Sequence, residues 1–81
     1  HLSGSIDRLV LVLADGIPVA ADVIDFKTDA AGEAAAARTS YFEQLRHYVR
    51  AVSLAYGIEA SAITARLAWL ATGNVETLPV P

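Results

Sequence analysis

Residues 19–27 read Val-Ala-Ala-Asp-Val-Ile-Asp-Phe-Lys, and their β-branched and aliphatic side chains predict a strand. Residues 5–13 have the same character and predict a preceding strand. Asp15-Gly16 between the two stretches favours a hairpin turn, and Pro18 cannot donate to a strand ladder. Both strands carry apolar residues on both faces, which is typical of central strands that are covered on each side.

One long helix is predicted in the middle of the chain. Residues 28–40 are expected to form a loop, with at most a short helical turn. Thr39 or Ser40 can then cap a helix, with Glu43 three residues after Ser40 completing a capping box. Apolar residues recur at helical spacing from there to Gly57, which fits the left-handed residue that follows a helix.

A second hairpin is predicted at the end of the chain. Residues 62–71 alternate as a strand, Thr72-Gly73-Asn74 forms the turn, and residues 75–78 form an edge strand. The predicted fold is therefore an α/β mixed sheet in the order β-β-α-β-β with one helix. The alternation places four residues on one face of the third strand: Ile63, Ala65, Leu67 and Trp69. Trp69 is expected to lie in the core or in an interface.

Composition limits the possible classes of protein. The 81 residues make one small domain, 54% of them are hydrophobic, and the mean hydropathy is +0.42. The absence of cysteine excludes disulfides and thiolate metal sites. No apolar run reaches the roughly 18 residues of a transmembrane helix. The net charge of −3 has the wrong sign for a broad DNA-binding surface. If DNA is the substrate, bound metal or a neighbouring domain must supply the positive potential.

Carboxylates inside the second strand indicate a metal site. Asp25 and Lys27 alternate onto one strand face, and apolar residues flank Asp25. Charged residues at strand ends are usually solvated, but an acid within a buried strand is costly unless it is paired or metal-bound. Magnesium prefers such oxygen ligands, commonly one or two carboxylates completed by water and phosphate.

The register of the first hairpin decides whether a second acid reaches this position. An odd loop centred on Gly16 would pair Leu13 with Val19 and Asp7 with Asp25, with Cβ atoms roughly 4.5–5.5 Å apart. A simple two-residue turn would instead place the two acids on opposite faces. A metal site therefore requires an odd loop or a β-bulge in this hairpin.

Three motifs occur in order along the chain. Residues 4–8, 23–29 and 41–48 read Gly-Ser-Ile-Asp-Arg, Val-Ile-Asp-Phe-Lys-Thr-Asp and Tyr-Phe-Glu-Gln-Leu-Arg-His-Tyr. They resemble the signature of RecB-family nucleases of the PD-(D/E)xK superfamily, which is Gly-x-Ile-Asp-Arg, (Val/Ile)-Asp-(Tyr/Phe)-Lys-Thr and a helical Gln-x-x-x-Tyr. The Lys-Thr-Asp ending is most similar to the nuclease domains of AddA/RecB-type helicase–nuclease subunits.

The resemblance implies a restriction-endonuclease-like core and a set of site residues. Asp7, Asp25 and the Phe26 carbonyl would hold Mg²⁺, or Mn²⁺ in its place. Lys27 would position the attacking water or stabilise the charged phosphate.

The resemblance also implies that Gln44 and Tyr48 brace the site or contact DNA. They lie at i and i+4, so one helix face can present both. Tyr48 also falls on the apolar stripe, where a plain core role is the alternative. Tyr41 is expected in the core, Arg8 on the face opposite Asp7, and His47 in solvent.

The implied activity is a magnesium-dependent DNA exonuclease that acts with a helicase in double-strand-break repair. Its expected partners are DNA, the helicase domain of the same parent chain and a second helicase–nuclease subunit. The expected location is the bacterial cytoplasm, at the nucleoid.

Residues 1–81 are interpreted as a partial domain, because family members have an N-terminal helix that contributes a further metal ligand. We therefore expect weak or no activity of the isolated chain, and an exposed apolar face that a second copy could cover. The alternatives are a non-catalytic nuclease-fold scaffold for DNA binding or helicase docking, and a related nuclease that is unattached to a helicase.

Overall fold

The structure is a computed structural model that describes residues 7–28 and 31–79, and only the backbone of residues 31–37. Four strands, one long helix and one short 3-10 helix follow one another along the chain. They are β1 (Arg8–Ala14), β2 (Ile17–Lys27), α1 (Ala31–Tyr56), η1 (Ala60–Ala62), β3 (Ile63–Trp69) and β4 (Asn74–Thr77).

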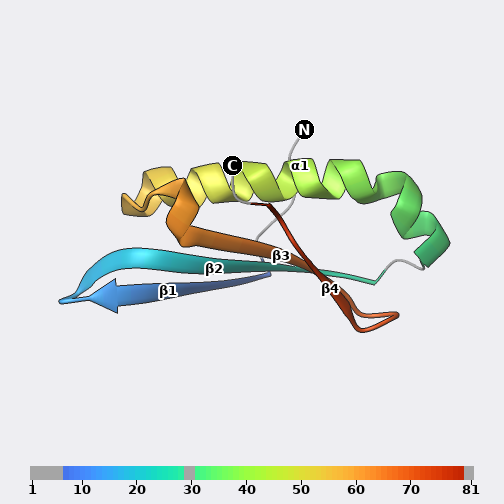
Figure 1. The fold of residues 1–81 in the computed structure, drawn as a ribbon, viewed down its shortest axis with the longest axis horizontal. Helices are drawn as coiled ribbons and strands as arrows, with labels where there is room; N and C mark the ends of the chain where they lie inside the picture. Colours follow the sequence, from blue (N-terminus) through green and yellow to red (C-terminus); the bar gives the residue numbers. More distant parts are fainter. Residues whose placement is uncertain (1–6, 29–30, 80–81) are drawn as a thin grey trace.

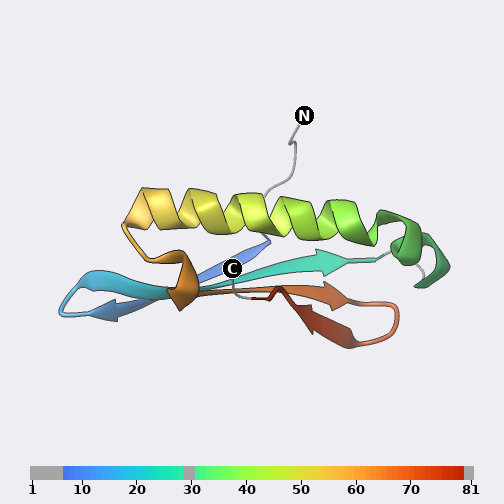
Figure 2. The ribbon, with the colours of Figure 1, turned by 45° about the horizontal axis from the view of Figure 1, so that its top comes forward.

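The strands form one mixed sheet in the order β1-β2-β3-β4. β2 and β3 are parallel, and each pairs with its hairpin partner, β1 or β4, in antiparallel fashion. The helix α1 connects the two parallel strands and lies across one face of the sheet (Figures 1 and 2). This small α/β architecture confirms the predicted element order and the mixed sheet.

The core lies between α1 and the sheet. Alternate residues of β2 and β3 face the helix, and the alternation predicted for β3 is confirmed: Ile63, Ala65, Leu67 and Trp69 are all buried. The helix meets them with residues spaced at three and four positions, as its amphipathic pattern predicts. The fully buried side chains at the centre are Val23, Leu45 and Leu67.

The β1–β2 hairpin combines a tight turn with a β-bulge. Asp15 and Gly16 have φ angles of 52° and 77°, so both central turn residues are left-handed, as a type I′ turn requires. The strand register then shifts between Val12 and Leu13, which leaves Val19 as the extra residue of β2. The turn thus has two residues, and the bulge shifts the register by the one residue that an odd loop would have supplied.

The bulge changes which residues of β1 and β2 lie opposite one another. Arg8 pairs with Ile24, so the next position along β1 brings Asp7 opposite Asp25. Without the extra residue, the turn would pair Asp7 with Ile24 and turn the two acids to opposite faces. The bulge alternative is therefore the correct one. The expected pairing of Leu13 with Val19 is wrong, because Leu13 pairs with Pro18.

The helix starts earlier than the sequence predicts. Residues 28–40 were expected to form a loop, but α1 begins at Ala31 and runs for 26 residues. Ser40 is an exposed residue in its middle and caps nothing. The alanine run at residues 34–37 explains the difference, because alanine has the highest helix propensity and outweighs the unfavourable Gly32.

The predicted end of the helix is confirmed. Gly57 has a φ of 67°, and the Ile58 amide donates to the Ser53 carbonyl at 3.2 Å. This pairing is the Schellman motif, in which a left-handed residue ends the helix. The Ser53 hydroxyl also donates to the Ile58 carbonyl at 2.5 Å, and the buried Ile58 side chain anchors the turn on the core.

The second face of the sheet is uncovered by the described residues, contrary to the expectation that both faces of both strands are covered. β1 is an edge strand, and the side chains of Val10, Val12, Phe26 and Val75 are all exposed. The half-buried ion pair of Arg66 with Asp22 crosses the same face. The apolar residues of β1 therefore reflect an open sheet face in this structure.

No helix in the described part of the chain is both long enough and apolar enough to cross a membrane.

Candidate functional site

Two carboxylates converge where β1 begins and β2 ends. Asp7 stands opposite Asp25 through the bulged register, and the two carboxyl groups are close enough for each to shift the pKa of the other. The Phe26 amide donates to Asp7 Oδ2 at 2.8 Å, which ties the start of β1 to the end of β2. The sequence prediction that these two acids meet is therefore reproduced in the structure.

Asp25 is the buried member of the pair, at 4% exposure. Lys27 lies two residues further along the same face, and its Nζ is 2.9 Å from Asp25 Oδ2. Among the described residues no donor is aligned for a hydrogen bond to this buried oxygen, so the contact with Lys27 is one of charge. A buried oxygen with spare acceptor capacity beside a second acid can accept a cation.

The two acids titrate in opposite directions. Burial raises the pKa of Asp25, and the neighbouring Asp7 adds to this rise against the lowering contact with Lys27. The hydrogen bond with Asp25 lowers the pKa of Asp7, as do the Phe26 amide and the charge of Lys27. The pKa values of the two acids diverge because the carboxyl groups lie close together, and a cation between them would offset the repulsion of their charged forms.

The Phe26 peptide group faces Asp7. Its N–H bonds to the Asp7 carboxylate, and the N–H and C=O of one strand residue point to the same edge. The Phe26 carbonyl is thus directed to the Asp7 side of β2. The Lys27 carbonyl points to the other edge, where it accepts from the Leu70 amide at 2.9 Å.

The ammonium group of Lys27 lies over the aromatic ring of Tyr41. Lys27 Nζ lies 4.2 Å from the ring centroid, within the range of a cation–π contact. The Tyr41 ring is half-buried and packs on Trp69 with centroids 5.9 Å apart. Tyr41 thus contributes to the site as well as to the core, which the sequence analysis did not expect.

A brace from β4 holds this aromatic pair in place. The Trp69 indole donates to Glu76 Oε2 at 2.8 Å, and the Arg38 guanidinium forms an ion pair with the same carboxylate at 2.5 Å. Both contacts lower the pKa of Glu76, with Arg38 the larger cause. Arg38 also stacks over the Phe42 ring, 4.8 Å from its centroid. The brace therefore connects α1, β3 and β4 behind Lys27.

Gln44 and Tyr48 come from the middle of α1. Tyr48 is buried, and its pKa is raised by burial and then by the charges of Asp25 and Asp7. Its hydroxyl therefore stays protonated beside the carboxylates, where it can donate a hydrogen bond. Gln44 is half-buried one turn earlier and makes no hydrogen bond with the described part of the chain.

The remaining predicted residues lie away from the carboxylates or beyond the description. Arg8 is exposed and pairs with Ile24, on the sheet face opposite Asp25, as expected. His47 is exposed on α1. Residues 4–6 of the first motif and Asp29 of the second lie outside the described residues.

The aromatic and ionic contacts behind Lys27 were missed at the level of sequence. Tyr41 offered one signal, because it precedes Gln44 by three residues and Tyr48 by seven and so shares their flank of the helix. Arg38 and Glu76 offered none, since 38 residues separate them and the first fell in a predicted loop.

A divalent cation fits the chemistry of the paired acids. Both supply hard oxygen atoms, and Mg²⁺ commonly uses one or two carboxylates with water and phosphate in the other positions. Within residues 7–28 and 31–79, no cluster of three or more histidine, cysteine, aspartate or glutamate side chains occurs. The donor set in the described chain is therefore two acids and the Phe26 carbonyl.

Comparisons with protein-family models, with curated proteins and with solved structures found no match to this chain.

Proposed function

We propose that this chain is the core of a RecB-like, metal-dependent DNA exonuclease domain with a restriction-endonuclease-like fold. The observation that carries the proposal is the meeting of Asp7 and Asp25 across the bulged hairpin, with Lys27 2.9 Å from Asp25. Paired acids followed by a lysine on one strand face suit phosphodiester hydrolysis, which needs a divalent cation and a positive charge at the phosphate.

In this proposal Asp7, Asp25 and the Phe26 carbonyl hold the cation. Mg²⁺ or Mn²⁺, when bound, would supply Lewis-acid charge and an acidic water. The Lys27 ammonium attracts the phosphodiester anion and stabilises the negative charge that develops on it. The Tyr41 ring holds this ammonium beside Asp25, and the Trp69–Glu76–Arg38 brace fixes the ring.

Gln44 and Tyr48 then present polar groups from the helix. Tyr48 keeps its hydroxyl proton because burial and the two acids raise its pKa, so it can donate to a phosphate oxygen or orient Asp25. Gln44 has amide groups that no described residue satisfies, and it can contact a DNA strand that enters beside Asp7.

The biological setting of the proposal follows the resemblance alone. It comprises DNA as substrate, a helicase domain and a second subunit as partners, and double-strand-break repair in the bacterial cytoplasm as the process. A second copy of the chain on the exposed sheet face, around Val10 and Phe26, belongs to the same proposal.

A cleavage assay tests the activity. The chain is incubated with end-labelled single-stranded or double-stranded DNA and Mg²⁺ or Mn²⁺, beside the Asp25→Asn and Lys27→Met variants. Since the partial domain is expected to be weakly active at most, the proposal expects slow, metal-dependent release of short products that both variants lack. A product ladder that persists in both variants would indicate a contaminating nuclease. If the chain binds a cation without cleaving DNA, the assay is repeated on a chain extended at its N-terminus; continued absence of cleavage there would favour the scaffold alternative, in which the fold binds DNA or a helicase without cutting.

A further inference from the structure

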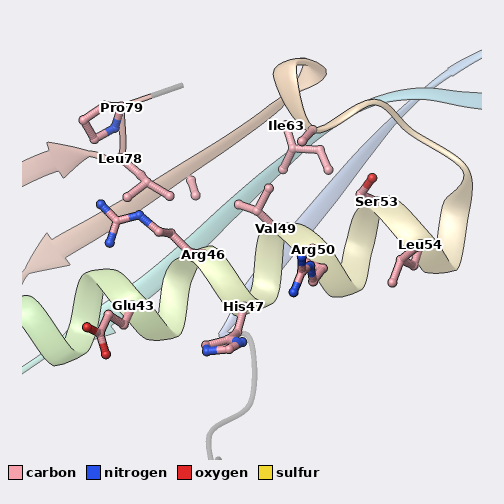
Figure 3. A pocket seen from close by; sticks show the side chains of 12 residues that line it. Glu43, Arg46, His47, Val49, Arg50, Ser53, Leu54, Ile63, Leu78 and Pro79 are labelled. Atoms are coloured by element: carbon pink, nitrogen blue, oxygen red, sulfur yellow. The ribbon is translucent and has the colours of Figure 1, made fainter. Parts of the chain in front are cut away.

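A groove runs along the flank of α1 that faces away from Gln44 and Tyr48. It has a volume of about 790 Å³ and lies between α1 and the segment from β3 to Pro79 (Figure 3). Its floor is aliphatic and includes Val49, Ile63 and Leu78. The volume falls within the roughly 300–1,000 Å³ of typical ligand pockets, which suits a short segment better than a folded domain.

Unpaired positive charge borders this floor. The chain has six lysine and arginine residues, and three of them form ion pairs, namely Lys27 with Asp25, Arg38 with Glu76 and Arg66 with Asp22. Arg46 and Arg50 have no acidic partner among the described residues, and both line the groove one helical turn apart. Figure 3 shows Arg46 reaching towards Leu78. Glu43 also lines the groove, so two arginines stand against one acid there. The groove therefore has an excess of positive charge in a protein whose net charge is −3.

The position of the groove separates it from the carboxylate site. Arg46 and Arg50 each follow Gln44 and Tyr48 by two residues, which is about 200° around a helix. A DNA strand held at Asp7 and Asp25 would meet the opposite flank of α1. No phenylalanine, tyrosine or tryptophan lines the groove, although bases usually stack on such rings in sites for single-stranded nucleic acid.

We propose that this groove docks an acidic amphipathic segment of a partner protein. Leucine-like side chains of the segment would fill the aliphatic floor, and its aspartates or glutamates would meet Arg46 and Arg50. The proposal stands apart from the nuclease activity, because none of the acids or the lysine of the carboxylate site lines the groove.

The experiment is an NMR titration of the ¹⁵N-labelled chain with two synthetic peptides. Both have twelve residues and leucines at helical spacing, and the polar positions carry glutamate in one and lysine in the other. We expect the glutamate peptide to shift the amide signals of Val49, Ser53 and Leu78 saturably, and the lysine peptide to leave them unchanged. Arg46→Glu/Arg50→Glu should weaken binding at least tenfold. Both arginines are exposed, so the variant should keep its fold, which its own spectrum verifies.

Arg8→Glu is the matched control, because Arg8 is also exposed and has no ion pair with another described residue, but lies on β1. It should leave the affinity for the glutamate peptide within twofold. Equal shifts with both peptides would overturn the proposal in favour of a purely apolar surface. Absence of saturable shifts would overturn it outright. Displacement of the glutamate peptide by an oligothymidine strand would replace it with a nucleic-acid surface.

Discussion

The Lys27→Met substitution should make the carboxylate site bind a divalent cation more tightly. Lys27 Nζ lies 2.9 Å from Asp25 Oδ2, and both side chains are largely buried. A cation that binds this oxygen must displace the ammonium or share the acid with it. Lys27 therefore competes with the metal as an internal cation.

The expected size of this effect follows from the contact. A contact between charged groups at hydrogen-bond distance contributes about 1.5–3 kcal/mol net. The Lys27 contact is not aligned as a hydrogen bond, so the lower end, about 1.5 kcal/mol, applies. Since about 1.4 kcal/mol is a tenfold change in a dissociation constant, the variant should bind Mn²⁺ about tenfold more tightly.

The assay is isothermal titration of Mn²⁺ into the wild type and the variant. It is made at pH 8, because loss of Lys27 also raises the pKa of Asp25 and would otherwise strengthen competition by protons. Lys27→Arg is the control that keeps the charge, and it should bind Mn²⁺ within about threefold of the wild type. Equal or weaker binding by Lys27→Met would refute the competition between Lys27 and metal.

Three further predictions concern stability. The raised pKa of Asp25 means that this carboxyl stabilises the fold below its unfolded pKa, and that this stabilisation is lost as pH rises through its folded pKa. Asp25→Asn should therefore raise the free energy of unfolding at pH 7 by about 1 kcal/mol, which corresponds to a melting temperature about 4–8 °C higher. Below about pH 3 the variant and the wild type should melt together. A variant that is less stable than the wild type at pH 7 would contradict this prediction. Gly57→Ala should cost about 1 kcal/mol in urea unfolding from its φ of 67° alone, since no atom lies within 4 Å of an added Cβ; an unchanged midpoint would argue against the left-handed cap. Trp69→Phe keeps a ring against Tyr41 but removes the hydrogen bond to Glu76, which should cost about 1–2 kcal/mol in stability. If the bond is the cause, the same substitution should cost clearly less in a Glu76→Ala background, a comparison in which the loss of the Arg38–Glu76 ion pair cancels.

The strand pattern could be predicted from the sequence because successive side chains of a strand point to opposite faces of the sheet. Alternation placed Asp25 and Lys27 on one side of β2, and it also predicted which residues of β3 share the face that is buried in the structure. Local turn chemistry likewise predicted the ends of elements, as at Asp15-Gly16 and Gly57.

The sequence did not predict the bulge at Val19 itself; it showed only that a metal site requires an odd loop or a bulge in this hairpin. The sequence there fits either an even or an odd hairpin, and the choice depends on how β2 is held by β3 and α1. The meeting of Asp7 with Asp25 was thus inferred from the chemistry of two acids rather than from the turn itself.

The contacts behind Lys27 could not be predicted for a different reason. They join Tyr41 and Arg38 of α1 to Trp69 and Glu76, which come together only after the sheet and the helix pack. The early start of α1 was not predicted either, because Gly32 disfavours a helix and only the summed propensity of the alanines that follow it outweighs this effect.

The most direct test of the paired carboxylates is a Mn²⁺ titration of the ¹⁵N-labelled chain, because Mn²⁺ is paramagnetic and broadens the signals of nearby nuclei. The Phe26 amide, which bonds to Asp7 and follows Asp25, is the reporter. We predict that its signal broadens first and saturably, that excess Mg²⁺ restores it, and that Asp25→Asn abolishes the effect. Broadening that is unchanged in the variant, or that begins at Glu76 or Glu59 and leaves Phe26 sharp, would contradict a cation site formed by Asp7 and Asp25.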